Sequence, residues 1–172
     1  MLSFNEIYFK HTFKNKRIFC YFISKICNWE YNNLYDHFII IPTKNKKVVE
    51  GIYFGKKIYF IQFIIQKNYI QDKFNKEILE KEILHNYNVS KYTTQIDQII
   101  QINFNLLKTD KKEIDEWHFK DENFIIPRNF YKIIILNLTQ LLKSNNLEYK
   151  NLANLFLLND KDKILEYIQK ET

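Results

Sequence analysis

Glycine, proline, alanine and arginine are almost absent from this chain of 172 residues. It has two glycines, two prolines, two arginines and one alanine, whereas aromatic residues make up 17% of it. Because the only glycines are Gly51 and Gly55, a glycine-rich phosphate loop, a dinucleotide-binding fingerprint and a nucleophile elbow of standard form are all excluded. The scarce residues have GC-rich codons, so this composition indicates an AT-rich genome rather than a function.

Cysteine and long apolar runs are scarce as well. Cys20 and Cys27 are the only cysteines, and their spacing matches no metal-binding pair. The densest apolar stretch, 58–65, is shorter than the roughly 18 residues that span a membrane. The apolar run at 18–23 is too short for a secretory signal. We therefore expect an intracellular protein of a reducing compartment, not a secreted one, with two free thiols, no membrane span, no metal and no cofactor.

The charge is basic, and lysine supplies nearly all of it. The formal net charge is +6, with 26 lysines and arginines against 20 acidic residues. Since only two of the cations are arginines, bidentate recognition of guanine or phosphate is almost impossible. Any contact with nucleic acid would therefore depend on lysine ammonium groups near phosphates, and it would weaken strongly with salt.

A β-hairpin is the clearest local pattern. Runs of β-branched and aromatic residues at 47–54 and 57–65 flank Gly55-Lys56, which predicts two antiparallel strands and a type II′ turn with positive φ at Gly55. The short apolar runs at 17–24 and 37–42 each predict a further buried strand.

Two segments after the hairpin have opposite periods. Residues 69–84 repeat apolar side chains with a helical period, which predicts one amphipathic helix. Residues 100–106 alternate apolar side chains with Gln101, Asn103 and Asn105, which predicts a half-buried strand with one polar face. Residues 115–118 (Asp-Glu-Trp-His) could contribute to an acid–base site, but without a partner they favour a surface turn.

The last third of the chain predicts helices. We expect them over 130–142, 149–157 and 161–170. Pro127 would open the first helix, and Asn159 lies at the break before the last one. Ala153, the only alanine, would allow the last two helices to pack closely, a pattern that resembles the helix-turn-helix motif. The alternative is a plain helical hairpin packed on the sheet.

Together these elements predict an α+β fold. We expect a mainly antiparallel sheet with a central hairpin and one amphipathic helix, followed by a C-terminal three-helix part, which could be helix-turn-helix or winged-helix-like. The sheet part would cover residues 1–122 and the helical part residues 123–172, although the two could form one continuous domain.

The hairpin also supplies the candidate nucleic-acid-binding residues, which are Lys46, Lys47, Tyr53, Lys56, Lys57 and Tyr59. Aromatic faces on a sheet can stack bases while lysines contact phosphates. Ordinary cross-strand aromatic packing is the alternative.

The predicted function is that of a non-catalytic, nucleic-acid-associated subunit of a larger nucleoprotein assembly, with RNA or DNA and other protein subunits as partners. The alternative is a structural subunit of a multiprotein complex without nucleic-acid contact. An enzyme is the least favoured class, because no constellation of catalytic residue types is complete. No small-molecule substrate is indicated.

Overall fold

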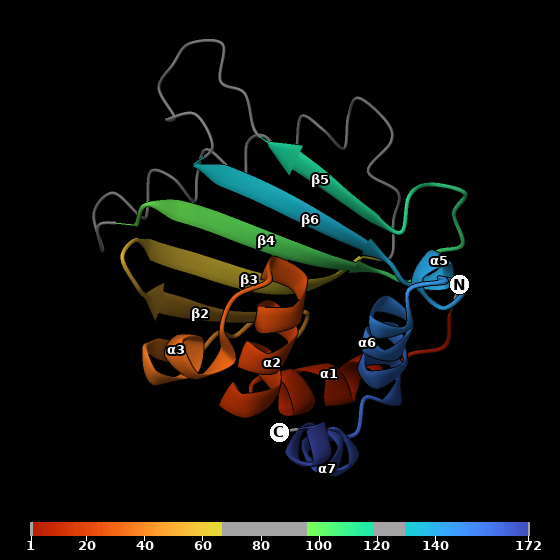
Figure 1. Cartoon of the computed structure of the whole chain (residues 1–172), viewed down its shortest axis with the longest axis horizontal. Coiled ribbons are helices and arrows are strands. Elements are labelled where there is room, and N and C mark those ends of the chain that lie inside the picture. The colour runs from red at the N-terminus through yellow and green to blue at the C-terminus, as the bar shows by residue number, and fades with distance from the viewer. Residues whose placement is uncertain (1, 67–95, 119–129, 172) are drawn as a thin grey trace.

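The computed structural model describes residues 2–66, 96–118 and 130–171, which form helices on one β-sheet. The helices are α1 (Glu6–Phe13), α2 (Lys16–Cys27), α3 (Tyr31–Asp36), α5 (Leu138–Leu141), α6 (Leu147–Leu158) and α7 (Lys161–Glu171). The strands are β1 (Phe38–Ile41), β2 (Val48–Phe54), β3 (Ile58–Gln66), β4 (Gln98–Asn105), β5 (Ile114–His118) and β6 (Tyr131–Asn137). Figure 1 shows α1, α2, α6 and α7 on one side of the sheet. The predicted α+β class is confirmed.

The sheet is mixed rather than mainly antiparallel. Its strand order is β1-β2-β3-β4-β6-β5, and the three strands at its centre, β3, β4 and β6, run parallel. The pairs β1–β2, β2–β3 and β5–β6 are antiparallel. Parallel strands are usually covered on both faces, which agrees with the nearly complete burial of β4 and β6.

The predicted hairpin is present, but its turn differs from the prediction. Strands β2 and β3 pair antiparallel up to Phe54 and Ile58, which leaves a loop of three residues. No described glycine has a positive φ, so the type II′ turn is wrong. A Cβ at position 55 would lie 2.8 Å from Cζ of Tyr53, so the Tyr53 ring would have to shift to admit any other residue.

The predicted strand at 17–24 is wrong, because these residues belong to helix α2. The Asn15 side chain accepts hydrogen bonds from the backbone N–H groups of Arg17 and Ile18 and so caps the start of the helix. Every residue from Ile18 to Ser24 is buried. The apolar run 18–23 by itself shows no period, and the helical period appears only when the flanking polar residues Arg17, Ser24 and Lys25 are included. The pattern does not predict α1 or α3 either.

The predicted helix over 130–142 is wrong as well, because most of this segment is a strand. Residues Tyr131–Asn137 form strand β6, and only Leu138–Leu141 are helical, as the short α5. Consecutive β-branched residues at 133–135 favour a strand, and a parallel strand buried on both faces reads as a continuous apolar run. The C-terminal part therefore has two full helices, α6 and α7, which confirm the predictions at 149–157 and 161–170.

Two further expectations about the sheet are corrected. Gln101, Asn103 and Asn105 do not form a solvated face but are buried. Residues 115–118 are not a surface turn but lie in the edge strand β5. The predicted amphipathic helix at 69–84 and the residue Pro127 lie outside the described residues.

Aromatic side chains form the centre of the core between sheet and helices. The ring of Phe156 on α6 stacks on Phe104 of β4, with centroids 4.0 Å apart, and on Phe4, at 4.8 Å. The same core includes Phe13 of α1 and Ala153, which is buried. Residues from both predicted parts of the chain, 1–122 and 123–172, thus share one core.

Asparagine replaces glycine and serine at the helix ends. Asn5, Asn15 and Asn146 each cap a helix start with a side chain that accepts backbone N–H groups. Asn28 and Asn159 end α2 and α6 in the left-handed region, with φ values of 55° and 48°. A chain almost without glycine can therefore still end its helices sharply.

Candidate functional site

The two predicted tyrosines lie side by side, but they are partly buried and packed against other aromatic side chains. Tyr53 and Tyr59 are direct cross-strand partners with stacked rings 6.0 Å apart. Trp29, from the loop between α2 and α3, covers both rings, at 5.4 Å from Tyr53 and 4.9 Å from Tyr59. The hydroxyl of Tyr53 also accepts a hydrogen bond from Asn33 Nδ2 at 2.6 Å. Burial raises the pKa of Tyr59, with Tyr53 as the next contribution. This arrangement favours cross-strand packing over base stacking.

The four predicted lysines do not form one patch. All are exposed, but Lys46 and Lys47 precede strand β2, whereas Lys56 and Lys57 lie in the loop after it. A strand rises about 3.4 Å per residue, so the two pairs are roughly 25 Å apart. A single phosphate cannot contact both pairs.

The first lysine pair gains neighbours that the sequence pattern does not indicate. Lys10 of α1 donates hydrogen bonds from Nζ to the carbonyl oxygens of Thr43 and of Asn45, the latter at 3.2 Å. These bonds hold the loop between β1 and β2 against α1. The resulting group, which we call the lysine corner, consists of Lys10, Lys14, Lys44, Lys46 and Lys47.

The lysine corner places several positive charges close together on an exposed edge of the molecule. Lys44, Lys46 and Lys47 are exposed, and no acidic residue occurs between Ile41 and Val49. Lys14 follows Lys10 by one helical turn and is exposed as well. Sequence reasoning misses Lys10 and Lys14 because their proximity to the loop depends on tertiary packing between α1 and the sheet.

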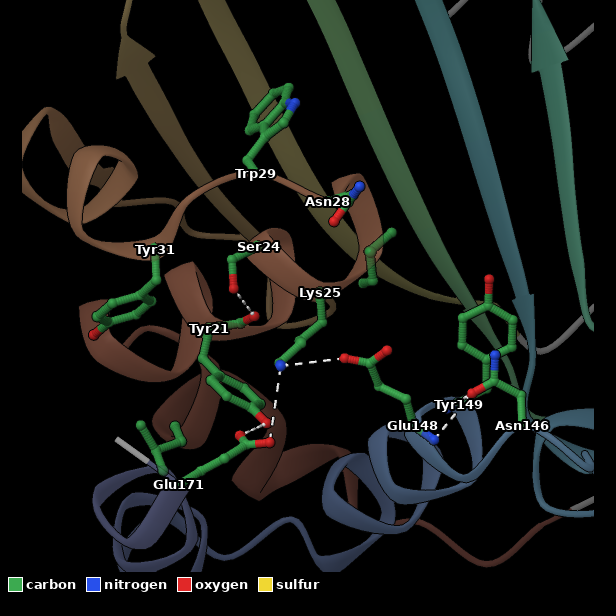
Figure 2. Close-up of a pocket in the computed structure, with 12 residues that line it drawn as sticks. Tyr21, Ser24, Lys25, Asn28, Trp29, Tyr31, Asn146, Glu148, Tyr149 and Glu171 are labelled. Carbon is green, nitrogen blue, oxygen red and sulfur yellow. Dashed lines mark hydrogen bonds and ion pairs between the residues drawn. The ribbon is translucent and has the colours of Figure 1, made fainter.

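A cleft of about 530 Å³ opens between α2, α6 and α7. Figure 2 shows the side chains that line it. Lys25 lies at its centre, with Nζ 3.2 Å from Oε1 of Glu148 and 3.8 Å from Oε1 of Glu171. The Tyr21 hydroxyl donates a hydrogen bond to the other oxygen of Glu171. Trp29 lies at the rim and points away from this cluster.

The charged groups of the cleft are already paired with one another. Burial, followed by the hydrogen bond to the Glu171 carboxylate, raises the pKa of the Tyr21 hydroxyl, so this group stays protonated. Ser24 donates its hydroxyl to the Tyr21 carbonyl at 2.7 Å and has no adjacent general base. The cluster therefore fastens α6 and α7 to α2 and supplies neither a nucleophile nor a free base.

The two cysteines do not form a disulfide. They lie seven residues apart in α2, which separates their Cα atoms by about 10 Å, more than a disulfide allows. Burial raises the pKa of each thiol to about 12. Both are therefore protonated and poorly reactive at neutral pH.

Neither a metal cluster nor a membrane-spanning helix is found within residues 2–66, 96–118 and 130–171. No group of three or more histidine, cysteine, aspartate and glutamate side chains could hold an ion there. No helix in these ranges is long and apolar enough to cross a membrane.

No protein-family model, no curated protein and no solved structure matches this chain. The function must therefore be argued from the geometry alone.

Proposed function

We propose that this protein is a non-catalytic subunit of a larger nucleoprotein assembly and that it contacts nucleic acid through phosphates. The observation that supports this proposal is the lysine corner, where Lys10 holds a loop with three exposed lysines against α1. Clustered ammonium groups neutralise adjacent phosphates and release counterions, which supplies affinity without reading sequence.

In this proposal the corner binds backbone and not bases. Tyr53 and Tyr59 are covered by Trp29, so they are poorly available for stacking. The scarcity of arginine also argues against recognition of guanine. Lys10 acts as a positioning residue, because its ammonium is bound to loop carbonyls, whereas Lys44, Lys46 and Lys47 carry the contacts.

We do not extend the proposal to a DNA-reading helix in the C-terminal part. Helices α6 and α7 follow one another across Asn159 and Asp160, which is compatible with a helix-turn-helix connection. However, α7 carries three lysines and three acidic residues, so its charge is balanced. We propose that α6 and α7 form a plain helical hairpin that packs on the sheet.

Charge reversal at the two ends of the hairpin tests the phosphate proposal. Lys46→Glu with Lys47→Glu should weaken binding to labelled single- and double-stranded oligonucleotides by about tenfold near 50 mM salt, and it should reduce the slope of log K against log salt by about two. Lys56→Glu with Lys57→Glu makes the same charge change roughly 25 Å away and serves as the matched control. Fluorescence anisotropy across a salt series measures both.

The control decides between a site and a general effect of charge. Equal losses in both double variants would mean that only net charge matters. Absence of binding at low salt, or affinity that does not change with salt, would overturn the nucleic-acid proposal.

A structural subunit without nucleic-acid contact is the second candidate, favoured by one apolar surface. Ile7 is 82% exposed and Tyr8 is 55% exposed at the start of α1. Asn159 Nδ2 donates to the carbonyl of Asn5, which brings the end of α6, where Leu158 is exposed, close to the start of α1. Apolar side chains left in water on neighbouring elements are typical of protein interfaces. Retention of a protein partner that is lost in an Ile7→Asp variant, together with absent oligonucleotide binding, would support this candidate.

A further inference from the structure

The two edges of the sheet are protected to different degrees. The edge strand β5 carries Asp115 and Glu116, and charges on an edge discourage pairing with another chain. The opposite edge strand, β1, has the sequence Phe-Ile-Ile-Ile, with no charge, proline or glycine. Ile39, at its middle, is 57% exposed. Within the described ranges β1 pairs only with β2, so its other side has no partner strand there.

The hydrogen-bond phase of β1 identifies the groups on this open side. The backbone N–H of Phe54 donates to the carbonyl of His37 at 2.8 Å, so these two residues form a bonded pair. Bonded and non-bonded pairs alternate in antiparallel ladders. The N–H and C=O groups of Phe38 and Ile40 therefore point away from β2, toward the open edge.

We infer that β1 pairs antiparallel with β1 of a second copy of this chain, which joins two six-stranded sheets across a two-fold axis. Pairing of Phe38 with Ile40 of the partner uses the outward groups of both residues in both copies and forms four hydrogen bonds. A shift toward the C-terminus would place Phe38 opposite Pro42, which has no N–H to donate. This register places Ile39 opposite itself, on the two-fold axis.

The charges that flank β1 select a second copy in this orientation. The exposed Asp36 precedes the strand, and the exposed Lys44, Lys46 and Lys47 follow it. Antiparallel pairing brings the acidic end of one strand near the basic end of the other, whereas parallel pairing would bring the lysines together. An antiparallel strand contact is also self-complementary, as a two-fold interface requires. Because β1 has only four residues, the contact is small and the dimer dissociates on dilution.

Opposite charges at position 39 test this dimer. Ile39→Lys and Ile39→Glu should each weaken association more than about tenfold, because two like charges then face each other on the axis. A mixture of the two variants should restore dimers as heterodimers. Ile7→Lys adds a charge at another exposed isoleucine and should associate like the wild type. Sedimentation velocity on the full chain over a concentration series measures the masses, and circular dichroism verifies folding.

A second measurement needs no variant. Hydrogen exchange on the wild-type chain should show that the amides of Phe38 and Ile40 gain protection as concentration rises, whereas those of β5 do not. A wild type that stays monomeric at every concentration, assemblies that grow beyond two copies, or variants at position 39 that dimerise like the wild type would overturn the inference. So would a mixture that yields no heterodimer.

Discussion

The two faces of the sheet bury their side chains by different means. The face under the helices is aromatic, with Phe104, Phe156 and Phe13 in mutual contact. The opposite face includes buried amides that bond in pairs across neighbouring strands, such as Asn105 with Asn137 at 2.7 Å. The first face gains its stability from packed apolar area. The second depends on matched donors and acceptors, because an unpaired buried amide costs more than a bonded one contributes.

A row of polar side chains crosses the second face. Gln101 donates from Nε2 to Gln62 at 3.4 Å and to the Tyr131 hydroxyl at 3.2 Å, and Gln62 in turn donates to Glu50 at 3.4 Å. Residues in register on β2, β3 and β4 provide this row. Glu50, Gln62 and Gln101 thus bond to one another across strands, whereas the buried Oδ1 of Asn103 on the same face has no hydrogen-bond partner among the described residues.

Phe156→Ala should cause the largest loss of stability and so tests the aromatic face. Its ring is fully buried and stacks on Phe104 at 4.0 Å, so truncation leaves a cavity and should cost about 3–5 kcal/mol. Urea unfolding followed by circular dichroism measures the loss. Phe54→Ala is the control on the other face, where the side chain is 40% exposed, and it should cost less than about 1 kcal/mol. Similar losses in the two variants would show that the aromatic face is not dominant.

The amide pair on the second face should show an intermediate effect with strong coupling. Asn137→Ala removes the acceptor of Asn105 Nδ2 and leaves that group buried, which should cost about 2 kcal/mol. In Asn105→Ala the side-chain Oδ1 of Asn137 loses its hydrogen-bond donor in the same way. The double variant should therefore cost about 1 kcal/mol less than the sum of the single variants. Additive costs in the unfolding cycle would mean that the pair does not act as a unit.

The same contrast explains which elements could be predicted. The hairpin β2–β3 and the helices α6 and α7 have local signals, such as runs around Gly55 and a capping asparagine at 146, and their predictions are confirmed. Strand β6 is buried on nearly all sides, so its apolar run carries no period, and the helical period of α2 appears only when the residues flanking the run 18–23 are included. The amides of β4 alternate with apolar residues as on a solvated face, and this local pattern does not show that Gln101 and Asn105 have hydrogen-bond partners on β3 and β6.

The candidate site was predictable to a smaller extent. The lysines at 46 and 47 can be identified from the sequence, but Lys10 joins them only because α1 packs against the loop before β2. The stacking of Tyr53 and Tyr59 follows from the hairpin register. Their cover, Trp29, lies in the loop between α2 and α3, and its contact with the two rings depends on tertiary packing that no local pattern reveals.

The smallest expected effect is a pH dependence confined to the polar row. Burial raises the pKa of Glu50 in the folded protein, while the hydrogen bond from Gln62 and the charge of Lys10 oppose this. Folding therefore favours the protonated acid, and its contribution to stability is present below the ordinary carboxyl pKa of about 4.3 and is lost as pH rises past the raised value. Glu50→Gln removes the ionisation but keeps an acceptor for Gln62.

This variant should thus be more stable than the wild type at neutral pH, by less than about 1 kcal/mol, and the difference should vanish in acid. Urea unfolding at several pH values measures it. Glu166→Gln, on the exposed face of α7, changes the same charge without burial and should shift stability little at any pH. A Glu50→Gln variant that is less stable at neutral pH, or a difference that does not change with pH, would contradict the argument. The side chain of Phe156 has no titratable group, so the loss in Phe156→Ala should not change over the same pH range.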